Sequence, residues 1–314
     1  MKPVSLPTAT PRASDDRATV FAPAKLNLFL HIVGRRPDGL HLLESLFVFA
    51  DIGDRLSLEP AAGVDLVVDG PGAPALAAVG GGGADNLAVR AAELLRERHG
   101  RPGDGVRIGL HKLLPVAAGI GGGSADAAAT LRGLIDLWGL SVDDPDLDRL
   151  ALDLGADVPA CLSPAPQFVS GIGERRRAVA GPGPLPVVLI NPGVAVATGP
   201  VFQAWAASGQ GFSPELADTD GGGAAPFDDL AWLAGHTHND LEVAAVARAP
   251  EIAQALDGLA GSDGCILARM SGSGATCFGL FDSDGAADHA ARRLARTRPS
   301  WWVRSGRLLD GSST

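Results

Sequence analysis

The sequence predicts an α+β protein with two layers and two domains. Candidate strands come first along the chain and candidate helices follow in blocks, which favours this class over a doubly wound parallel sheet. The length of 314 residues suggests two domains, at roughly 150 residues each. Apolar residues make up 46% of the chain and charged residues 20%, which is typical of an ordinary globular protein.

The first half begins with strands and then alternates glycine loops with helices. Alternating apolar residues predict strands at 18–33, 42–50, 55–59, 64–68 and 106–111. A turn is expected at 51–54, and the strands at 55–59 and 64–68 are expected to form a hairpin. Helical spacing predicts helices at 86–99, 124–138 and 146–154, with Ser124 as the N-cap of the second.

The second half has fewer strands and more interruptions by proline. A buried strand is expected at 187–190, and a strand, a glycine loop and a second strand across 267–281. Helices are expected at 244–259 and 286–296. The segment 219–226 is expected to be a flexible surface insertion, and residues 1–17 a disordered tail.

Charge and cysteine content exclude several classes of protein. A net charge of −10 argues against nucleic acid as the main partner and against an anionic membrane surface. No apolar run approaches the length of a membrane span, and the N-terminus has no apolar signal core. The three cysteines, Cys161, Cys265 and Cys277, are too widely spaced for a disulfide framework or a zinc site. We therefore expect a soluble cytoplasmic protein.

Lysine is scarce, and one lysine stands in an unusual place. The chain has only Lys2, Lys25 and Lys112, and it has no Tyr. Lys25 lies within an apolar strand, where a charge is costly unless it meets an anion. Three interpretations are open: a buried salt bridge, an edge residue whose charge snorkels to solvent, or a cation directed at a carboxylate or a transferring phosphate.

The strongest local signal is a glycine loop before a small-residue helix. Gly119 and the three glycines from Gly121 to Gly123 let backbone N–H groups converge on one point, and a helix N-terminus adds its dipole. Phosphate is the expected ligand. A Walker loop is excluded because the chain has no Gly-Lys dipeptide, and neither the dinucleotide fingerprint nor the protein-kinase loop fits the surroundings.

Three further segments carry weaker signals. Asp157 follows a predicted helix and reads equally well as a turn residue or a functional carboxylate. The glycine loop from Ser271 to Ala275 lies between strands, as either a hairpin or an anion nest. The pair His236 and His238 could bind a metal, although a solvated loop is the favoured interpretation.

Together these features resemble the superfamily of galactokinase, homoserine kinase, mevalonate kinase and phosphomevalonate kinase, the GHMP kinases. Its middle motif is matched from Pro115 to Ala128 and its third motif from Ser271 to Ala275. The block from Pro23 to His41 is similar to the branch that acts on 4-diphosphocytidyl-2-C-methyl-D-erythritol. Further matches lie at 46–47, 85–87, 154–159, 191–193 and 239–242, so the resemblance runs from Ala22 to Phe281.

The resemblance implies a two-domain GHMP kinase fold, with an ATP-binding domain at 18–165 and a ferredoxin-like α/β sandwich at 166–314. It implies ATP-dependent phosphorylation of the 2-hydroxyl of that cytidyl substrate, in the non-mevalonate route to isoprenoid precursors, by a monomer or homodimer that also uses Mg²⁺. Two alternatives stay open: another GHMP kinase, of mevalonate or homoserine type, and a catalytically silent nucleotide-binding protein. A Rossmann oxidoreductase is the most distant alternative.

The resemblance also assigns residues. Lys25 and Asp157 take the catalytic places: Asp157 would accept the proton of the acceptor hydroxyl, and Lys25 would stabilise charge. The expected ATP-binding residues are Pro115, Val116, Ala117, Ala118, Gly119, Ile120, Gly121, Gly122, Gly123, Ser124 and Ala125, with Ser124 a candidate Mg²⁺ ligand. The expected substrate-binding residues are Asn27, His41, Phe202, Ser271, Gly272, Ser273 and Gly274.

Two departures from the family pattern matter. Leu40 stands where the family commonly has an aromatic residue before the His, so we expect His41 and Phe202 to compensate, with Phe202 stacked on the cytosine. Ser124-Ala125-Asp126 replaces a common Ser-Ser-Asn, which puts the polar role of the second position in doubt. Because both substrates are anionic, we also expect a local basic cleft around Lys25.

Overall fold

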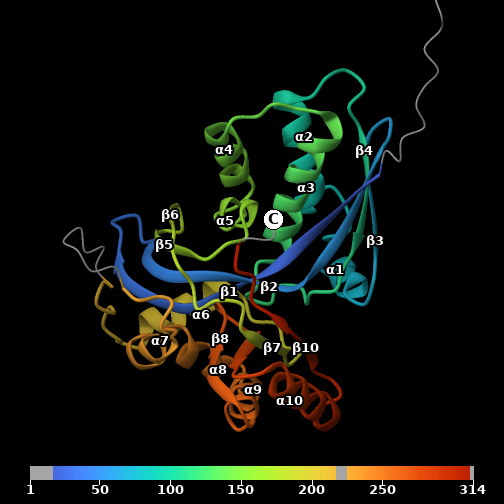
Figure 1. Ribbon diagram of the computed structural model, residues 1–314. Helices are drawn as coiled ribbons and strands as arrows, with labels where there is room; N and C mark the ends of the chain where they lie inside the picture. The colour runs from blue at the N-terminus through green and yellow to red at the C-terminus, as the bar shows by residue number, and fades with distance from the viewer. Residues whose placement is uncertain (1–16, 217–224, 312–314) are drawn as a thin grey trace, which may run out of the picture.

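Two β-sheets lie back to back between two layers of helices. The computed structural model describes residues 17–216 and 225–311. In Figure 1 the helices of residues 87–162 lie above the long strands β1 (Ala18–Arg35) and β2 (His41–Pro60), and the helices of residues 242–297 lie below the second sheet. The α+β prediction is therefore confirmed. The expectations for residues 1–16 and for most of the segment 219–226 lie outside the described residues.

The first sheet has six strands arranged around one long central strand. They are β1 (Ala18–Arg35), β2 (His41–Pro60), β3 (Val64–Asp69), β4 (Val106–His111), β5 (Gln167–Gly171) and β6 (Arg175–Ala178). The order is β3-β4-β2-β5-β6, and β1 pairs antiparallel with β2 along its length. Because β2 is long, its second half pairs with β4 and its first half with β5.

Two predictions for this sheet are wrong. Residues 51–54 continue β2 instead of forming a turn, because Gly53 and Asp54 pair with Pro23 and Ala22 of β1. The hairpin expected from 55–59 and 64–68 does not form, because β4 lies between β2 and β3 and pairs with both of them. The two segments are close in the sequence, which suggests that they pair directly. Instead β4, which comes later in the chain, lies between them.

From residue 17 onward, the helices of the first half are α1 (Ala73–Ala78), α2 (Leu87–His99), α3 (Gly122–Trp138), α4 (Asp144–Leu154) and α5 (Val158–Leu162). Asn86 caps α2, since its side chain accepts a hydrogen bond from Ala88 N at 2.9 Å. The prediction that Ser124 caps α3 is wrong. Gly121 is the N-cap, with φ of 63°, so this left-handed glycine turns the chain into the helix and Ser124 lies within the first turn.

The second sheet has the strand order β10-β7-β9-β8, with neighbouring strands antiparallel. Its strands are β7 (Pro186–Asn191), β8 (Cys265–Met270), β9 (Cys277–Phe281) and β10 (Trp302–Arg307). The helices of this half are α6 (Thr198–Ala207), α7 (Leu230–His236), α8 (Glu242–Arg248), α9 (Glu251–Ala260) and α10 (Asp284–Thr297). This order and the β-α-β-β-α-β succession are those of a ferredoxin-like sandwich. The single helix expected at 244–259 is two helices, broken at Ala249-Pro250.

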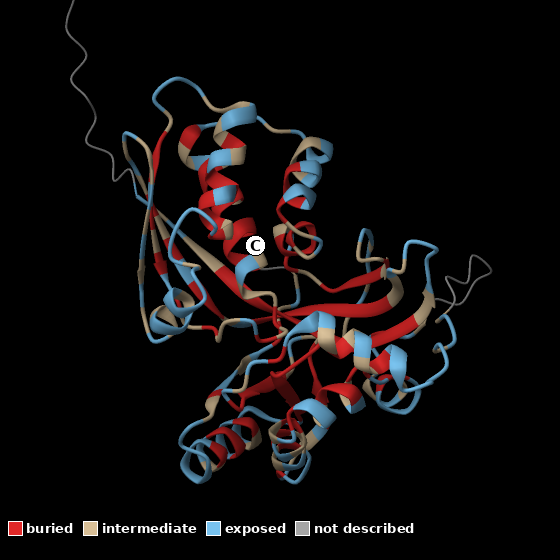
Figure 2. Cartoon of the chain, turned by 180° about the vertical axis from the view of Figure 1, so that it is seen from behind, coloured by how far each residue is buried: buried red, intermediate tan, exposed pale blue. Residues whose placement is uncertain are grey.

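Burial follows the layers. Figure 2 shows buried residues along α3, along the central strands and between the two sheets. Along β7 the side chains alternate: Val187 and Leu189 pack in the cluster between the sheets, and Val188 and Ile190 pack against the helices of the second half. None of the helices in the described ranges has the length and apolar run that a bilayer crossing requires.

The boundary between the two halves stays a proposal. The sheets favour a boundary after β6 over the expected position at residue 165, because β5 and β6 extend the first sheet. The last residues return to the first half, since Leu308 forms a bridge with Ala50 and Leu309 N donates to Phe49 O at 2.8 Å.

Candidate active site

The two predicted catalytic residues face each other. Lys25 Nζ lies 3.2 Å from Asp157 Oδ2. Lys25 is 4% exposed on β1, whereas Asp157, the N-cap of α5, leaves 37% of its side chain open. The ammonium group also donates to Asn27 Oδ1 at 2.9 Å and lies 4.1 Å from the centre of the Phe47 ring. The lysine is therefore held in place and pairs with a carboxylate that solvent can reach.

Asn27 and Ser271 join this pair to the second half of the chain. Asn27 Nδ2 donates to Ser45 Oγ at 2.9 Å, and Asn27 N donates to Ser271 Oγ at 3.1 Å. Ser271 Oγ in turn donates to Gly119 O at 2.9 Å. Ser271 is fully buried, and its hydroxyl group bonds to both the strand and the glycine loop. These bonds favour a role for Ser271 in fixing the loop over direct contact with substrate.

The glycine loop turns its carbonyl groups into the protein. The carbonyls of Ala118, Gly119, Ile120 and Gly121 accept hydrogen bonds from Thr276 N, Ser271 Oγ, Lys25 N and Ala125 N, at 3.1, 2.9, 3.0 and 2.8 Å. The N–H groups of the first turn of α3 have no intrahelical acceptor, and no side chain caps them. The loop therefore offers donors, as a phosphate site requires.

Two clefts meet at this loop. The larger, of about 420 Å³, is lined by residues 115–119, by residues 121–124, and by Asp85 to Leu87. The smaller, of about 190 Å³, contains Lys25, Asn27, Asp157, Phe202, Gly272 and Ser273. Gly119, Gly121 and Thr198 line both clefts. Lys25 and Asp157 line the smaller cleft, beside the glycines that both clefts share.

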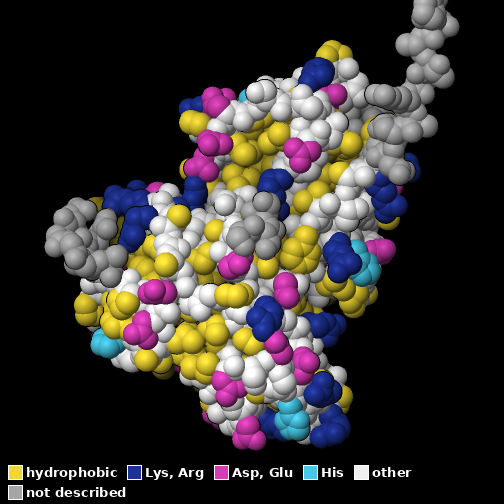
Figure 3. Space-filling view, viewed as in Figure 1, with side chains coloured by type: hydrophobic (Ala, Val, Ile, Leu, Met, Phe, Trp, Pro, Cys, Tyr) yellow, Lys and Arg dark blue, Asp and Glu magenta, His cyan; other side chains and the backbone are white. Residues whose placement is uncertain are grey.

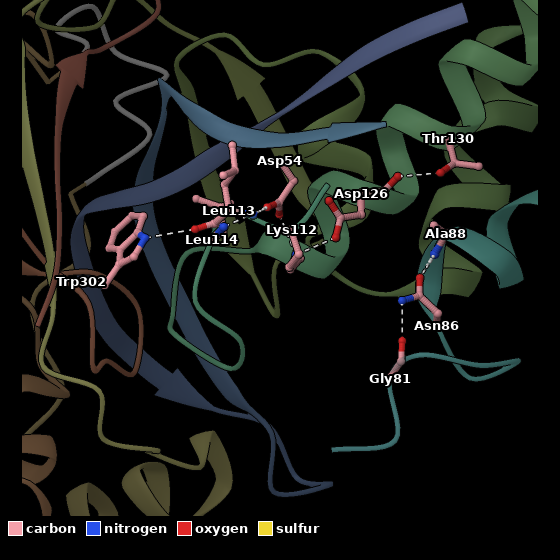
Figure 4. A network of polar contacts seen from close by, with 10 residues as sticks. All are labelled: Asp54, Gly81, Asn86, Ala88, Lys112, Leu113, Leu114, Asp126, Thr130 and Trp302. Atoms are coloured by element: carbon pink, nitrogen blue, oxygen red, sulfur yellow. Dashed lines mark hydrogen bonds and ion pairs between the residues drawn. The ribbon is translucent and has the colours of Figure 1, made fainter. Parts of the chain in front are cut away.

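A second buried lysine lies beneath the loop. Figure 4 shows Lys112 between Asp54 and Asp126, with Nζ at 2.6 and 2.7 Å from their carboxylates. Asp54 Oδ1 also accepts from Leu113 N and Leu114 N, which fixes the start of the glycine loop. Lys112 is not among the predicted site residues, although the scarcity of lysine is a signal that could have identified it.

This network holds three charges away from water. Burial opposes the charge on Lys112, yet Asp126 and Asp54 outweigh that effect and hold its pKa above the ordinary value. Burial raises the pKa of Asp126 to about 7; Lys112 opposes this rise and Asp54 adds to it. Both Lys112 and Asp126 line the larger cleft, so the charge of this cluster acts on any anion bound there.

An aromatic group closes one side of the smaller cleft. The Phe202 ring is stacked on His41, with centroids 5.3 Å apart and planes at 22°, and Trp205 meets His41 edge-on at 5.3 Å. His41 Nε2 is buried without a hydrogen-bond partner. Burial, and then Arg35, lower the pKa of His41, which favours the neutral ring. Leu40 is 49% exposed. These contacts are compatible with the expected cytosine site, and that role stays a prediction.

The larger cleft contains the oxygen donors that a Mg²⁺ ion carried with ATP would need. Ser124 lines it, and Asp126 Oδ1 is buried without a partner. Because Mg²⁺ commonly takes one or two protein oxygens together with phosphate oxygens, this donor set fits. In the described ranges no group of three or more His, Cys, Asp or Glu side chains is placed to hold a metal, and His238 pairs with Asp240 at 2.8 Å.

The prediction of a basic cleft is wrong, because the charged side chains that line the clefts do not have a positive net charge. The charged side chains that line the two clefts within the described residues are Lys25, Lys112, Asp85, Asp126 and Asp157. Figure 3 shows acidic and basic side chains interspersed over the face turned toward the viewer, with a group of basic ones at the edge where β6 lies. Attraction for phosphate at the loop therefore comes from backbone N–H groups and the dipole of α3, which side-chain charge does not reveal.

Comparisons with known proteins agree with this geometry. The family model for the GHMP kinases N terminal domain matches residues 86–164, and the model for the GHMP kinases C terminal matches residues 227–299. A homoserine kinase from Cytophaga hutchinsonii, 19% identical with a TM-score of 0.70, and a mevalonate kinase from L. major, 16% identical with a TM-score of 0.62, share the fold. The fold and the site define the chain as a GHMP kinase.

Relatives of higher sequence identity identify the branch of the superfamily to which the chain belongs. The 4-diphosphocytidyl-2-C-methyl-D-erythritol kinase of Cereibacter sphaeroides (strain KD131 / KCTC 12085) is 48% identical over 92% of this chain and 98% of its own. The kinase of the same name from Methylorubrum extorquens (strain PA1) is 47% identical over the same shares. A crystal structure of 4-(cytidine 5'-diphospho)-2C-methyl-D-erythritol kinase is 36% identical, with a TM-score of 0.73 over 93% of this chain and 99% of that one. The chain belongs to the 4-diphosphocytidyl-2-C-methyl-D-erythritol kinase family.

Proposed function

We propose that the chain transfers the γ-phosphoryl group of ATP to the 2-hydroxyl of 4-diphosphocytidyl-2-C-methyl-D-erythritol. The observation that carries the proposal is the Lys25–Asp157 pair, which lines the smaller of two clefts that share the glycine loop. ATP would occupy the larger cleft with its phosphates on the loop, and the cytidyl substrate would occupy the smaller one. Membership of the family supports this choice of substrate over mevalonate and homoserine.

The chemistry follows from the positions of these groups. A bond forms between the acceptor oxygen and the γ-phosphorus, the bond from γ-phosphorus to the bridging oxygen breaks, and ADP leaves. Asp157 accepts the hydroxyl proton, and its partly exposed carboxylate lines the substrate cleft. Lys25 stabilises the negative charge that develops beside it. Mg²⁺, when bound with ATP near Ser124, would neutralise phosphate charge.

Ser273 and Thr198 form a second contact across the junction. Their hydroxyl oxygens lie 2.9 Å apart, and both line the substrate cleft. We infer that these two hydroxyls, and not that of Ser271, are available to substrate. We also propose a cytoplasmic location, as the composition indicates; whether the chain acts as a monomer or a homodimer stays a prediction.

The test is turnover with three acceptors and one carboxylate variant. We expect ATP consumption with the cytidyl substrate and none with mevalonate or homoserine. Asp157→Asn should lower kcat by about 10²–10⁴-fold, because loss of a general base costs that much. Asp153→Asn, at an exposed carboxylate on α4, is the matched control and should keep full activity. Undiminished turnover in Asp157→Asn would refute the role of the base, and preference for another acceptor would refute the substrate.

A further inference from the structure

One arginine reaches both elements that carry the catalytic pair. Arg132 lies in the middle of α3, and in the described residues its guanidinium donates hydrogen bonds to backbone carbonyls. Nη1 donates to Cys161 O at 2.6 Å and Leu162 O at 3.2 Å, and Nη2 donates to Phe21 O at 3.2 Å. Cys161 and Leu162 end helix α5, and Phe21 lies on β1 four residues before Lys25.

The carbonyls that Arg132 binds belong to a helix that cannot satisfy them itself. Helix α5 has five residues, so its last carbonyls need partners from outside. Gln167 Nε2 donates to Ala160 O at 3.0 Å and to Ser163 O at 2.8 Å. Arg132 donates to the carbonyls of the two residues between these, Cys161 and Leu162. A guanidinium at the C-terminal end of a helix also interacts favourably with its dipole. Arg132 and Gln167 together therefore fix the C-terminal end of α5.

Asp157 stands at the other end of this helix. It is the N-cap residue, and its side chain makes no capping hydrogen bond, so the position of its carboxylate depends on the backbone of α5. Lys25, its partner, depends on β1. Arg132 bonds to both elements from α3, whose N-terminus forms the phosphate loop. The guanidinium thus connects the three elements that place base, cation and phosphate.

We propose that Arg132 is a positioning residue that sets the separation of Lys25 and Asp157 by holding α5 and β1 to α3. The proposal rests on the proposed phosphoryl transfer, in which these two side chains act. Reacting groups must be held close to their productive geometry, and a displacement of about 1 Å can cost 10²-fold in rate. Loss of Arg132 should therefore lower the rate of transfer more than the binding of either substrate.

The first experiment compares Arg132→Met, Arg132→Lys and Arg292→Met. Arg292 is an exposed arginine on α10 and serves as the matched control. We expect Arg132→Met to lower kcat by about 10- to 100-fold and to change either KM by less than about 3-fold. Arg132→Lys should recover part of the loss, and Arg292→Met should lose nothing. Thermal unfolding monitors the folded fraction of each variant. A kcat that falls only in proportion to that fraction, or a KM that accounts for the loss, overturns the proposal.

The second experiment is a double-mutant cycle with Asp157→Asn. If Arg132 acts through Asp157, adding Arg132→Met to Asp157→Asn should change the residual kcat by less than about 3-fold. Losses that multiply overturn the proposal. A crystal structure of Arg132→Met gives a readout without activity, since the distance from Lys25 Nζ to Asp157 Oδ2 should exceed the present 3.2 Å. An unchanged distance overturns the inference about Arg132, whereas an inactive wild-type chain overturns the proposed function.

Discussion

The contacts of Lys25 show how a buried charge is stabilised at a candidate catalytic position. An ammonium group in an apolar strand is unfavourable alone, and here Asp157, Asn27 and the face of Phe47 offset the cost. The salt bridge that is one interpretation of the sequence is present, and both of its residues line the smaller cleft. The catalytic role of Lys25 stays a prediction. A lysine inside an apolar run could be predicted to meet an anion. Which anion it meets depends on α5, some 130 residues later.

Substitution of Phe202 tests whether the smaller cleft binds the cytidyl substrate. Its stack on His41 places an aromatic face on the cleft that also contains Lys25 and Asp157. Stacking on a base contributes about 1–3 kcal/mol, so Phe202→Ala should raise KM for the cytidyl substrate by about 5- to 150-fold. Phe202→Leu keeps much of the volume without the ring and should show most of the same effect. Steady-state kinetics check this, and an unchanged KM in Phe202→Ala contradicts it.

His31 gives a prediction for stability against pH. It is buried on β1, and its Nε2 accepts a hydrogen bond from His238 N at 3.2 Å. Burial, and then His238, lower the pKa of His31 to about 4; Asp240 opposes this shift and Arg269 adds to it. Between pH 6.5 and 4 the unfolded chain binds the proton more readily, so this residue removes stability as pH falls through that window.

The measurement is the free energy of unfolding as a function of pH. The loss from His31 should be on the order of 2–3 kcal/mol across the window, and His31→Gln should remove that part of the slope because its amide does not titrate. His289→Gln, at an exposed histidine of α10, is the control and should leave the slope unchanged. Equal slopes in wild type and His31→Gln would contradict the prediction.

At the scale of elements, the loop before α3 depends on what surrounds it as well as on its own conformation. Gly119 has φ of 74°, and a Cβ there would lie 2.5 Å from Ser271 O and 2.7 Å from Gly274 O. Gly139, at the other end of α3, has φ of 56° with no atom within 4 Å of such a Cβ. An alanine at either position would therefore have the same unfavourable backbone conformation, but only at Gly119 would its Cβ also clash with neighbouring atoms.

Alanine at each position separates these effects. Gly139→Ala should cost about 1 kcal/mol of stability and leave KM for ATP unchanged. Gly119→Ala should cost more and raise KM for ATP by at least about 10-fold, since the loop must move away from Ser271 and Gly274. Denaturant unfolding and ATP kinetics on both variants check the comparison. Similar effects from the two substitutions would show that strain alone accounts for the choice of glycine.

The element predictions fail where distant pairing decides the outcome. The strands and most helices follow from periodicity, because each alternates or repeats within its own sequence. The continuity of β2 through Gly53 follows from its partner β1, and the start of α3 follows from the φ of Gly121. Neither is visible in the local pattern. The composition of the loop predicts an anion site, but three of its four bonded carbonyls have partners from β1 and from the loop after β8.

At the scale of the whole molecule, the second sheet supports the ATP loop through Trp302. Its indole Nε1 on β10 donates to Leu113 O at 3.0 Å, next to the Lys112 network (Figure 4). Trp302→Phe leaves that carbonyl without this donor, at a cost of about 1–3 kcal/mol in stability, and should raise KM for ATP several-fold. Trp301→Phe, one residue earlier and partly buried against the core of the second half, is the control. Equal KM values in the two variants contradict the link.

The site could be predicted in its parts but not as an assembly. Lys25, the glycine loop and Asp157 are each recognisable, and the family resemblance orders them. Arg132 and Trp302 are not recognisable, because an arginine and a tryptophan in ordinary surroundings carry no local signal of what they bind. Their roles depend on contacts between segments that the fold alone brings together, such as β10 with residue 113 and α3 with the end of α5.

The inward-facing carbonyls of the glycine loop have a consequence for inhibitor design. Four successive carbonyls each accept a hydrogen bond within the protein, whereas the N–H groups of the first turn of α3 have no intrahelical acceptor. A compound designed for this loop should therefore bring acceptor atoms, such as a sulfonate or carboxylate, and should bind there more tightly than an amine or amidine.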